Sequence, residues 1–130
     1  MKALVGTELG VFTVDLDEEE VLELDEAERL APPIVEGISL PLLVAVDAVG
    51  SRVVAVVGRR PPLVISNDAG TTWREAGGGL PPGRGVVVHP DDPDTILYAA
   101  RNRLYLSANG GIFWRALAPE LPEIVAIAWG

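Results

Sequence analysis

The sequence predicts an all-β protein assembled from short antiparallel strands. The 130-residue chain carries 14 glycines and 11 prolines, and these turn-forming residues recur at short intervals along it. Between them lie short segments rich in Val, Leu and Ile, residue types that favour strands. Because 48% of the residues are hydrophobic, the chain can bury a core, and we expect one domain over residues 1–130.

An internal repeat organises the chain. The segment Ser66–Trp73 recurs as Ser107–Trp114, and each copy is followed by an arginine and then by a Leu-Pro pair. A third, weaker copy aligns Lys2–Thr13 without gaps on Ile96–Ser107. Self-similarity at a fixed spacing is typical of repeat architectures in which each unit is one supersecondary element. The chain therefore holds three repeats.

The first complete copy resembles an Asp-box, the Ser-x-Asp-x-Gly-x-Thr-Trp motif of the bacterial neuraminidase repeat. The rhythm of the copies is similar to that of sialidase, sortilin and photosystem II assembly factor-like propellers. This resemblance covers nearly the whole chain and implies a β-propeller, whose blades are four-stranded antiparallel sheets with strand A innermost and strand D outermost. The residues expected to hold the C–D turns are Ser66, Asp68, Gly70, Thr72, Trp73, Ser107, Asn109, Gly111 and Trp114.

Elementary chemistry favours a structural role for these motif residues. Glycine is needed where φ is positive, and Gly70 and Gly111 meet that need in a tight turn. The Asp68 carboxylate can accept hydrogen bonds from amides of its own turn. A Ca²⁺ site is the alternative, since carboxylates and carbonyls converge there, but one aspartate per turn supplies few ligands. We therefore predict no metal and no cofactor.

Placing each motif between strands C and D lays out about three blades. The second blade spans about 42–80 and the third about 85–121, each with four strands. The first spans about 2–30 and begins at strand B, so it lacks an innermost strand. The segment Ile124–Trp129 has the pattern of an A strand with no blade after it. Each end of the chain thus supplies what the other is missing.

This complementarity predicts a homodimer. Three blades are too few to close a ring, which typically needs about four to eight. An open array would also expose apolar sheet faces and unpaired strand edges. We therefore expect a six-bladed ring of two chains, in which Ile124–Trp129 of each chain completes the first blade of its partner. A ring with another multiple of three blades is the alternative. For residues 17–30 we prefer a strand followed by a polar loop over the alternative of an acidic helix.

Composition limits the classes of function. The net charge of −9 argues against nucleic-acid binding, which requires a basic face. The absence of cysteine excludes disulfides and cysteine nucleophiles. His89 is the only histidine, so neither a histidine metal cluster nor a Ser-His-Asp triad can form within one chain. No stretch is long enough to span a bilayer, and we expect a cytoplasmic protein.

Arginines gather on one predicted face. In a propeller blade the B–C and D–A loops lie on the same face of the disc, and five arginines fall in such loops. Guanidinium groups suit carboxylates and phosphates, so these residues predict a non-catalytic binding or assembly scaffold with a site for an anionic or protein partner. Polar residues also gather in loops without any such role. The five are Arg59, Arg60, Arg84, Arg101 and Arg103.

The alternative function is a glycan-binding or glycoside-hydrolase-like protein related to sialidases. Such a site would need three converging arginines, a tyrosine nucleophile with a glutamate partner, and an acidic residue. The only tyrosines, Tyr98 and Tyr105, fall on predicted strands B and C, away from a central pocket. We therefore lean against an enzyme and predict no catalytic residue.

Overall fold

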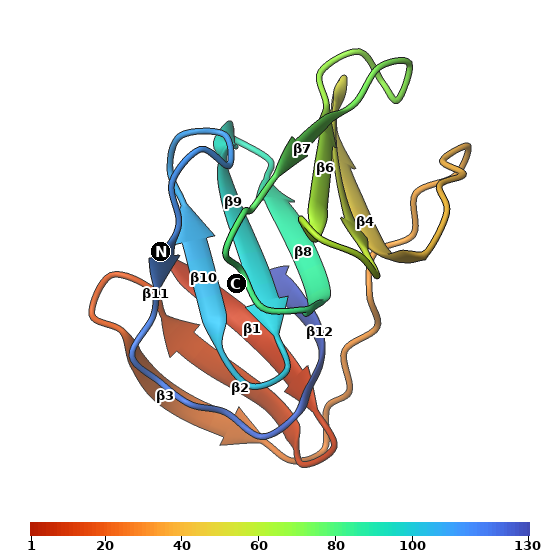
Figure 1. The fold of residues 1–130 in the computed structure, drawn as a ribbon. Coiled ribbons are helices and arrows are strands. Elements are labelled where there is room, and N and C mark those ends of the chain that lie inside the picture. The colour runs from red at the N-terminus through yellow and green to blue at the C-terminus, as the bar shows by residue number, and fades with distance from the viewer.

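Three four-stranded antiparallel sheets make up the computed structural model, which describes residues 1–130 (Figure 1). The first blade contains, from inside outward, β12 (Ile124–Trp129), β1 (Lys2–Thr7), β2 (Gly10–Asp15) and β3 (Glu20–Asp25). The second contains β4 (Leu43–Val49), β5 (Arg52–Val57), β6 (Leu63–Ser66) and β7 (Arg74–Ala76). The third contains β8 (Gly83–His89), β9 (Asp92–Ala100), β10 (Leu104–Ser107) and β11 (Arg115–Ala116).

This architecture confirms the predicted all-β fold of three four-stranded blades. All the elements are strands. The structure contains no helix that is long and apolar enough to cross a membrane.

Strand β5 shows why valine-rich segments form the middle of a blade. Successive side chains of a strand point to opposite faces of the sheet. Val54 and Val56 therefore face the third blade, while Val53, Ala55 and Val57 face the other way. All five side chains are buried, because both faces of the second blade are covered. A strand covered on both faces carries a continuous apolar run instead of an alternating one.

The two alternatives for residues 17–30 resolve in favour of a strand. Residues Glu20–Asp25 pair with β2 in antiparallel register, with an irregularity between Thr13 and Val14. Every residue of β3 is exposed, and its carboxylates lie along the outer edge of the first blade. Charged side chains on an edge strand discourage pairing with other chains. Tertiary pairing with β2 therefore prevails over the helical propensity of this acidic segment.

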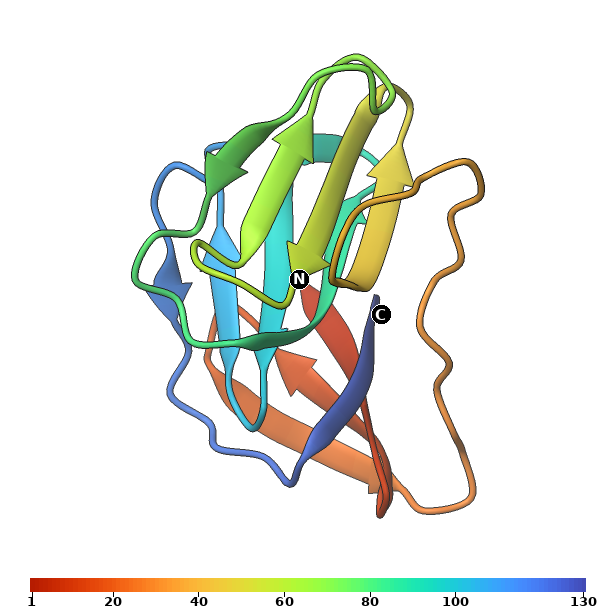
Figure 2. The same cartoon turned by 45° about the vertical axis from the view of Figure 1, so that its right-hand side comes forward.

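The third blade lies in the middle and packs against both others. One buried cluster fills the space between the second and third blades, and another fills the space between the third and first. Figure 2 shows the resulting order, with the second blade on one side of the third and the first blade on the other. Side chains at the first interface include Val56, Leu63, Ile65, Val88, Ile96 and Tyr98; those at the second include Val5, Val14, Leu97, Leu104, Ile124 and Ile127.

The structure corrects the predicted partner of the C-terminal strand. Ile124–Trp129 is the innermost strand of the first blade, as expected, but it pairs with β1 of its own chain, with Ala3 opposite Trp129. The amide of Gly130 also donates to the Lys2 carbonyl at 2.9 Å. The expected exchange between chains did not take into account that residues 26–42 are long enough to carry the first three strands to the far side of the third blade (Figure 1).

The connection between the first and second blades has no regular secondary structure. Residues 26–42 run along one side of the molecule from the end of β3 to the start of β4 (Figure 2). We call residues 31–42 the strap. Its Val35, Ile38 and Leu40 pack against a buried cluster on the second blade, on the face turned away from the third blade. That cluster comprises Val46, Val53, Ala55, Val57 and Val64.

Candidate functional site

The turn between β6 and β7 is held by its own side chains. The Ser66 hydroxyl donates to Asp68 Oδ1 at 2.7 Å and accepts from the amide of Gly70 at 2.8 Å. The Asp68 carboxylate also accepts from the hydroxyl and the amide of Thr72, at 2.6 and 2.8 Å. These hydrogen bonds, with those from Thr72 contributing most, lower the pKa of Asp68 to about 2. The φ of +93° at Gly70 is one that glycine adopts without strain.

The turn between β10 and β11 repeats this arrangement with an amide in place of the carboxylate. Asn109 Oδ1 accepts from the Ser107 hydroxyl at 3.1 Å and from the amide of Phe113 at 3.0 Å. The Gly111 amide donates to Ser107 Oγ at 2.9 Å, and the Trp114 indole donates to the Gly111 carbonyl at 3.0 Å. The side-chain oxygens of Ser66, Asp68, Ser107 and Asn109 are thus engaged in hydrogen bonds within their own turns.

Three arginines outside the predicted set join neighbouring blades. The Arg52 guanidinium donates to Asn67 Oδ1 at 2.6 Å and to the Pro93 carbonyl at 2.8 Å. Arg74 donates to the Gly110 carbonyl of the next blade at 2.7 Å. Arg115 pairs with Glu19 of the first blade at 2.7 Å. Arg74 and Arg115 each follow the tryptophan of a repeat copy, and this shared position was the sequence signal that could have indicated their contacts with the next blade.

The five predicted arginines line a continuous groove on one face of the molecule. Three adjoining hollows, of about 290, 750 and 420 Å³, share lining residues from one to the next. Pro82 lines all three, because the connection between β7 and β8 runs along the whole groove. We call this feature the arginine groove. Its arginines are Arg59 and Arg60 at one end, and Arg84, Arg101 and Arg103 at the other.

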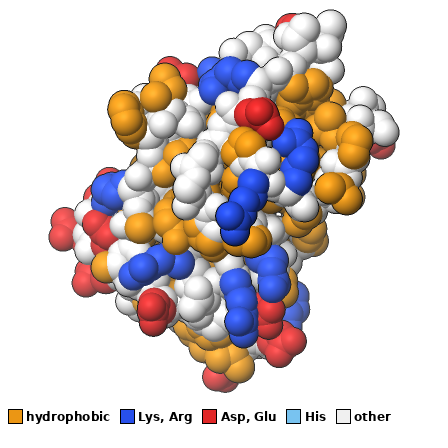
Figure 3. Space-filling view, in the orientation of Figure 1, with side chains coloured by type: hydrophobic (Ala, Val, Ile, Leu, Met, Phe, Trp, Pro, Cys, Tyr) orange, Lys and Arg blue, Asp and Glu red, His pale blue; other side chains and the backbone are white.

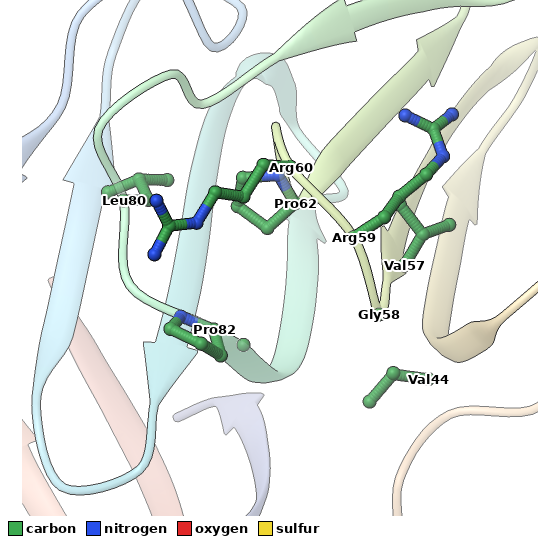
Figure 4. Close-up of a pocket in the computed structure, with 9 residues that line it drawn as sticks. Val44, Val57, Gly58, Arg59, Arg60, Pro62, Leu80 and Pro82 are labelled. Atoms are coloured by element: carbon green, nitrogen blue, oxygen red, sulfur yellow. The ribbon is translucent and has the colours of Figure 1, made fainter.

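Basic side chains are spread over the face seen in the orientation of Figure 1. Lys and Arg side chains form separate patches from the top to the lower part of this face, with Asp and Glu side chains among them (Figure 3). The close-up in Figure 4 shows Arg60 extending toward the connection that carries Leu80 and Pro82, whereas Arg59 points away from it. The strand placement differs slightly from expectation, since Arg84 belongs to β8 and not to the loop before it.

The groove arginines differ in how firmly they are already engaged. Arg59 pairs with Glu75 at 2.9 Å. Arg84 pairs with Glu123 at 2.9 Å, and Arg101 approaches the same carboxylate at 3.9 Å with its side chain 75% exposed. Such exposed ion pairs are worth only about 0–1 kcal/mol, so a ligand carboxylate can replace them.

The two remaining groove arginines have no carboxylate partner. Arg60 is exposed and makes no ion pair. Arg103 reaches the Ala118 carbonyl at 3.5 Å, and its Nε is buried without a hydrogen-bond partner. An accessible guanidinium therefore lies at each end of the groove: Arg60, which has no ion pair, at one end, and the 75% exposed Arg101 at the other.

The floor of the groove is apolar and is pinned from below. Tyr98 is fully buried, and its hydroxyl donates to the Pro81 carbonyl at 2.5 Å. Gly83 leaves room for this ring, because a Cβ at that position would lie 2.5 Å from the tyrosine oxygen. Burial raises the pKa of Tyr98, so its hydroxyl stays protonated and donates throughout the ordinary pH range. The tyrosine thus supports the groove from below.

A carboxylate links the innermost strands of the second and third blades. Asp47 on β4 accepts a hydrogen bond from the amide of Val88 on β8 at 2.8 Å. This amide lies on the edge of the blade, where no further strand pairs with it. Burial raises the pKa of Asp47, against the opposing effect of the amide hydrogen bonds. Sequence patterns gave no indication of this contact, because it joins segments from different repeats.

Comparison with known proteins places the fold. No protein-family model matches the chain, and no curated protein matches it. Among solved structures, the chain is similar to YCF48 bound to D1 peptide, with a TM-score of 0.52 and 18% sequence identity. The match covers 94% of this chain and 37% of that chain, so the present sequence spans well under half of the neighbour's length. The likeness shows that the three blades have the arrangement of part of a β-propeller.

Proposed function

We propose that this part-propeller is a cytoplasmic, non-catalytic binding scaffold that takes an acidic, extended segment of a partner protein along the arginine groove. The observation that carries the proposal is the continuity of three hollows that bring five arginines around one apolar floor. The two C–D turns serve as structural Asp-boxes that hold the blades, and the side-chain oxygens of Asp68 and Asn109 accept hydrogen bonds within these turns.

The shape of the groove favours a peptide over a compact anion. Its arginines lie at two ends, separated by Leu80, Pro81, Pro82 and Tyr105. An extended peptide can place carboxylates at both ends and an apolar side chain on the floor between them, whereas a small anion would engage one end only. Aromatic-lined grooves commonly accept extended peptides, and Tyr105 supplies an aromatic side chain here. That the similar protein YCF48 was solved with a peptide bound agrees with this class of ligand.

The net charge of the protein sharpens the expected selectivity. The chain as a whole carries −9, so an acidic peptide is repelled by most of the surface and attracted at the arginine groove. Attraction between exposed charges weakens as salt rises. We therefore expect binding that is selective for position on the protein and falls with ionic strength.

The proposal is tested with a fluorescein-labelled synthetic decapeptide in which glutamates flank a central leucine pair. Fluorescence anisotropy measures its affinity for the protein and for the double variant Arg60→Glu/Arg101→Glu, which reverses the charge of one exposed arginine at each end of the groove. Loss of two charge-assisted contacts at exposed positions is expected to weaken binding by roughly tenfold or more. Raising the salt concentration should weaken wild-type binding in the same assay.

The matched control is Arg29→Glu. Arg29 lies in the connection between β3 and β4 and donates only to the carbonyls of Glu26 and Glu28, away from the groove. The Arg29→Glu variant reverses one arginine charge elsewhere on the surface and should leave the peptide affinity within about twofold of the wild type. Equal affinity of wild type and double variant would contradict the proposal. Turnover of a fluorogenic glycoside by the purified wild type would favour the sialidase-related alternative instead.

We further propose that two chains form a six-bladed ring. Three blades occupy half of such a ring and leave two open ends, one at the first blade and one at the second. Each chain closes its own first blade with β12, so the two copies would meet through blade faces and not through an exchanged strand.

A further inference from the structure

The strap covers the outer face of the second blade with side chains alone. Val35, Ile38 and Leu40 pack on the buried cluster around Val53 and Val57. Residues 31–41 make no hydrogen bond to the blade, and the backbone contact at the base of the strap is the Gly58 amide donating to the Leu42 carbonyl at 2.8 Å. A segment held in this way can leave the face without breaking any hydrogen-bonded strand pairing.

The face under the strap has an equivalent in the third blade, where that face packs against a neighbouring blade. Val53 stands opposite Ser66 in the second blade, as Ile96 stands opposite Ser107 in the third. Ile96 therefore occupies the equivalent position, and it packs against the second blade at an internal interface. The strap thus occupies the place that a neighbouring blade fills one position further round the array.

The other open end belongs to the first blade. Leu4 and Thr13 pair across β1 and β2 and lie on the face turned away from the third blade, because their neighbours Val5 and Val14 pack toward it. The connection from β3 touches this end as well, since a Cβ on Gly6 would lie 2.8 Å from that of Leu30. The chain contains no other blade face without a blade beside it, so the two open ends are the natural partners of one another in a second copy.

We propose that the strap is a displaceable cap, and that a second copy of this chain replaces it by docking the outer face of its first blade on the outer face of the second blade. The inference rests on the proposed six-bladed ring and adds the surfaces and the element that controls access to them. With the strap in place the outer face of the second blade is covered, and the chain stays a monomer. With the strap released on both copies, two such interfaces form and complete the ring.

The test compares the dimer dissociation constant of the wild type with that of Ile38→Ser/Leu40→Ser, measured by sedimentation velocity over a concentration series. The substitutions remove two of the three apolar contacts of the strap and leave the blades untouched. Because a closed strap reduces the fraction of binding-competent chains, loosening it is expected to tighten the dimer by about tenfold or more. The control is Ile34→Ser, whose side chain is 90% exposed and which should change nothing.

A second variant separates specific docking from general stickiness. Adding Thr13→Lys to the loosened strap places a charge on the outer face of the first blade, and the two-chain species should disappear while circular dichroism still reports a folded protein. Dimers that survive this charge would overturn the proposed surface. A wild-type dimer that the loosened strap does not tighten would overturn the cap and leave the ring standing. Monomers in every sample would overturn both, whereas peptide binding at the arginine groove is measured independently.

Discussion

Replacing Tyr98 with phenylalanine isolates the contribution of one hydroxyl to the floor of the arginine groove. The ring stays in place, because it is fully buried and packs edge-on against Tyr105 and Trp114 at centroid distances of 6.1 and 5.9 Å. The lost interaction is the hydrogen bond from the tyrosine oxygen to the Pro81 carbonyl. The free energy of unfolding should therefore fall without any change in core packing.

The size of the effect follows from the surroundings of the two atoms. A neutral intramolecular hydrogen bond contributes about 1 kcal/mol net. The Pro81 carbonyl belongs to a half-buried residue and can take up water once the hydroxyl is gone, so the larger cost of a sealed, unsatisfied group does not apply. For a chain of this length a loss of about 1 kcal/mol corresponds to a melting temperature lower by roughly 3–5 °C. Because the same carbonyl fixes the groove wall, peptide affinity should weaken with it.

Thermal and urea unfolding followed by circular dichroism measure the change. Tyr105→Phe is the matched control, because Tyr105 lies on the neighbouring strand β10 and its hydroxyl makes no hydrogen bond within the chain. Its removal should leave stability within a few tenths of a kcal/mol. If Tyr98→Phe is as stable as the wild type, or if the control loses as much, the groove floor is not held by this hydrogen bond.

Two further predictions concern carboxylates. The pKa of Asp47 is raised in the folded protein, so its contribution to stability is present below the pKa of the unfolded chain and is lost as pH rises through the folded pKa. Asp47→Asn can still accept the hydrogen bond from the Val88 amide and should raise the melting temperature at pH 7. This gain should shrink toward pH 3, where the Asp47 carboxyl of the wild type is protonated. Asp68 has a pKa lowered to about 2, so its contribution is present above pH 4 and is lost as pH falls toward 2. Asp68→Asn, the residue found at Asn109, should lower the melting temperature at pH 7, and the gap to the wild type should close over that acidic window.

Sequence patterns sufficed for most strands because these depend on local chemistry; β3 is the exception, since its pairing with β2 prevails over the helical propensity of its residues. Runs of valine between turn residues placed β5 and β8, and the C-terminal strand was assigned with the observed bounds, Ile124–Trp129. The partner of that strand was not predictable in the same way. Any edge of suitable pattern can pair with it, and the choice depends on where residues 26–42 allow β1 to travel. Apart from β3, strand identity is a local property, whereas the choice of pairing partner depends on the connection.

The groove shows the same limit at the level of side chains. The position of the arginines on one face followed from the order of loops in a blade. Which of them are engaged did not, because Glu75 and Glu123 come from a different strand and a different connection. The contacts of Arg52 and Asp47 also lay beyond sequence reasoning, since both join one repeat to the next and a repeat alignment compares units without placing them side by side.

The pairing of β12 with β1 also determines when the fold can be completed. Ribosomes deliver β1, β2 and β3 first, yet the sheet they belong to lacks its innermost member until Trp129 has emerged opposite Ala3. Until then the inner edge of β1 is an unpaired template in a partly made chain, which is the kind of species that aggregates. Contacts of such high sequence separation also slow folding, because the intervening chain must be closed into a loop before they form. The second and third blades, whose strands are consecutive, can assemble during synthesis. They then offer a surface against which β1, β2 and β3 can pack before β12 is made.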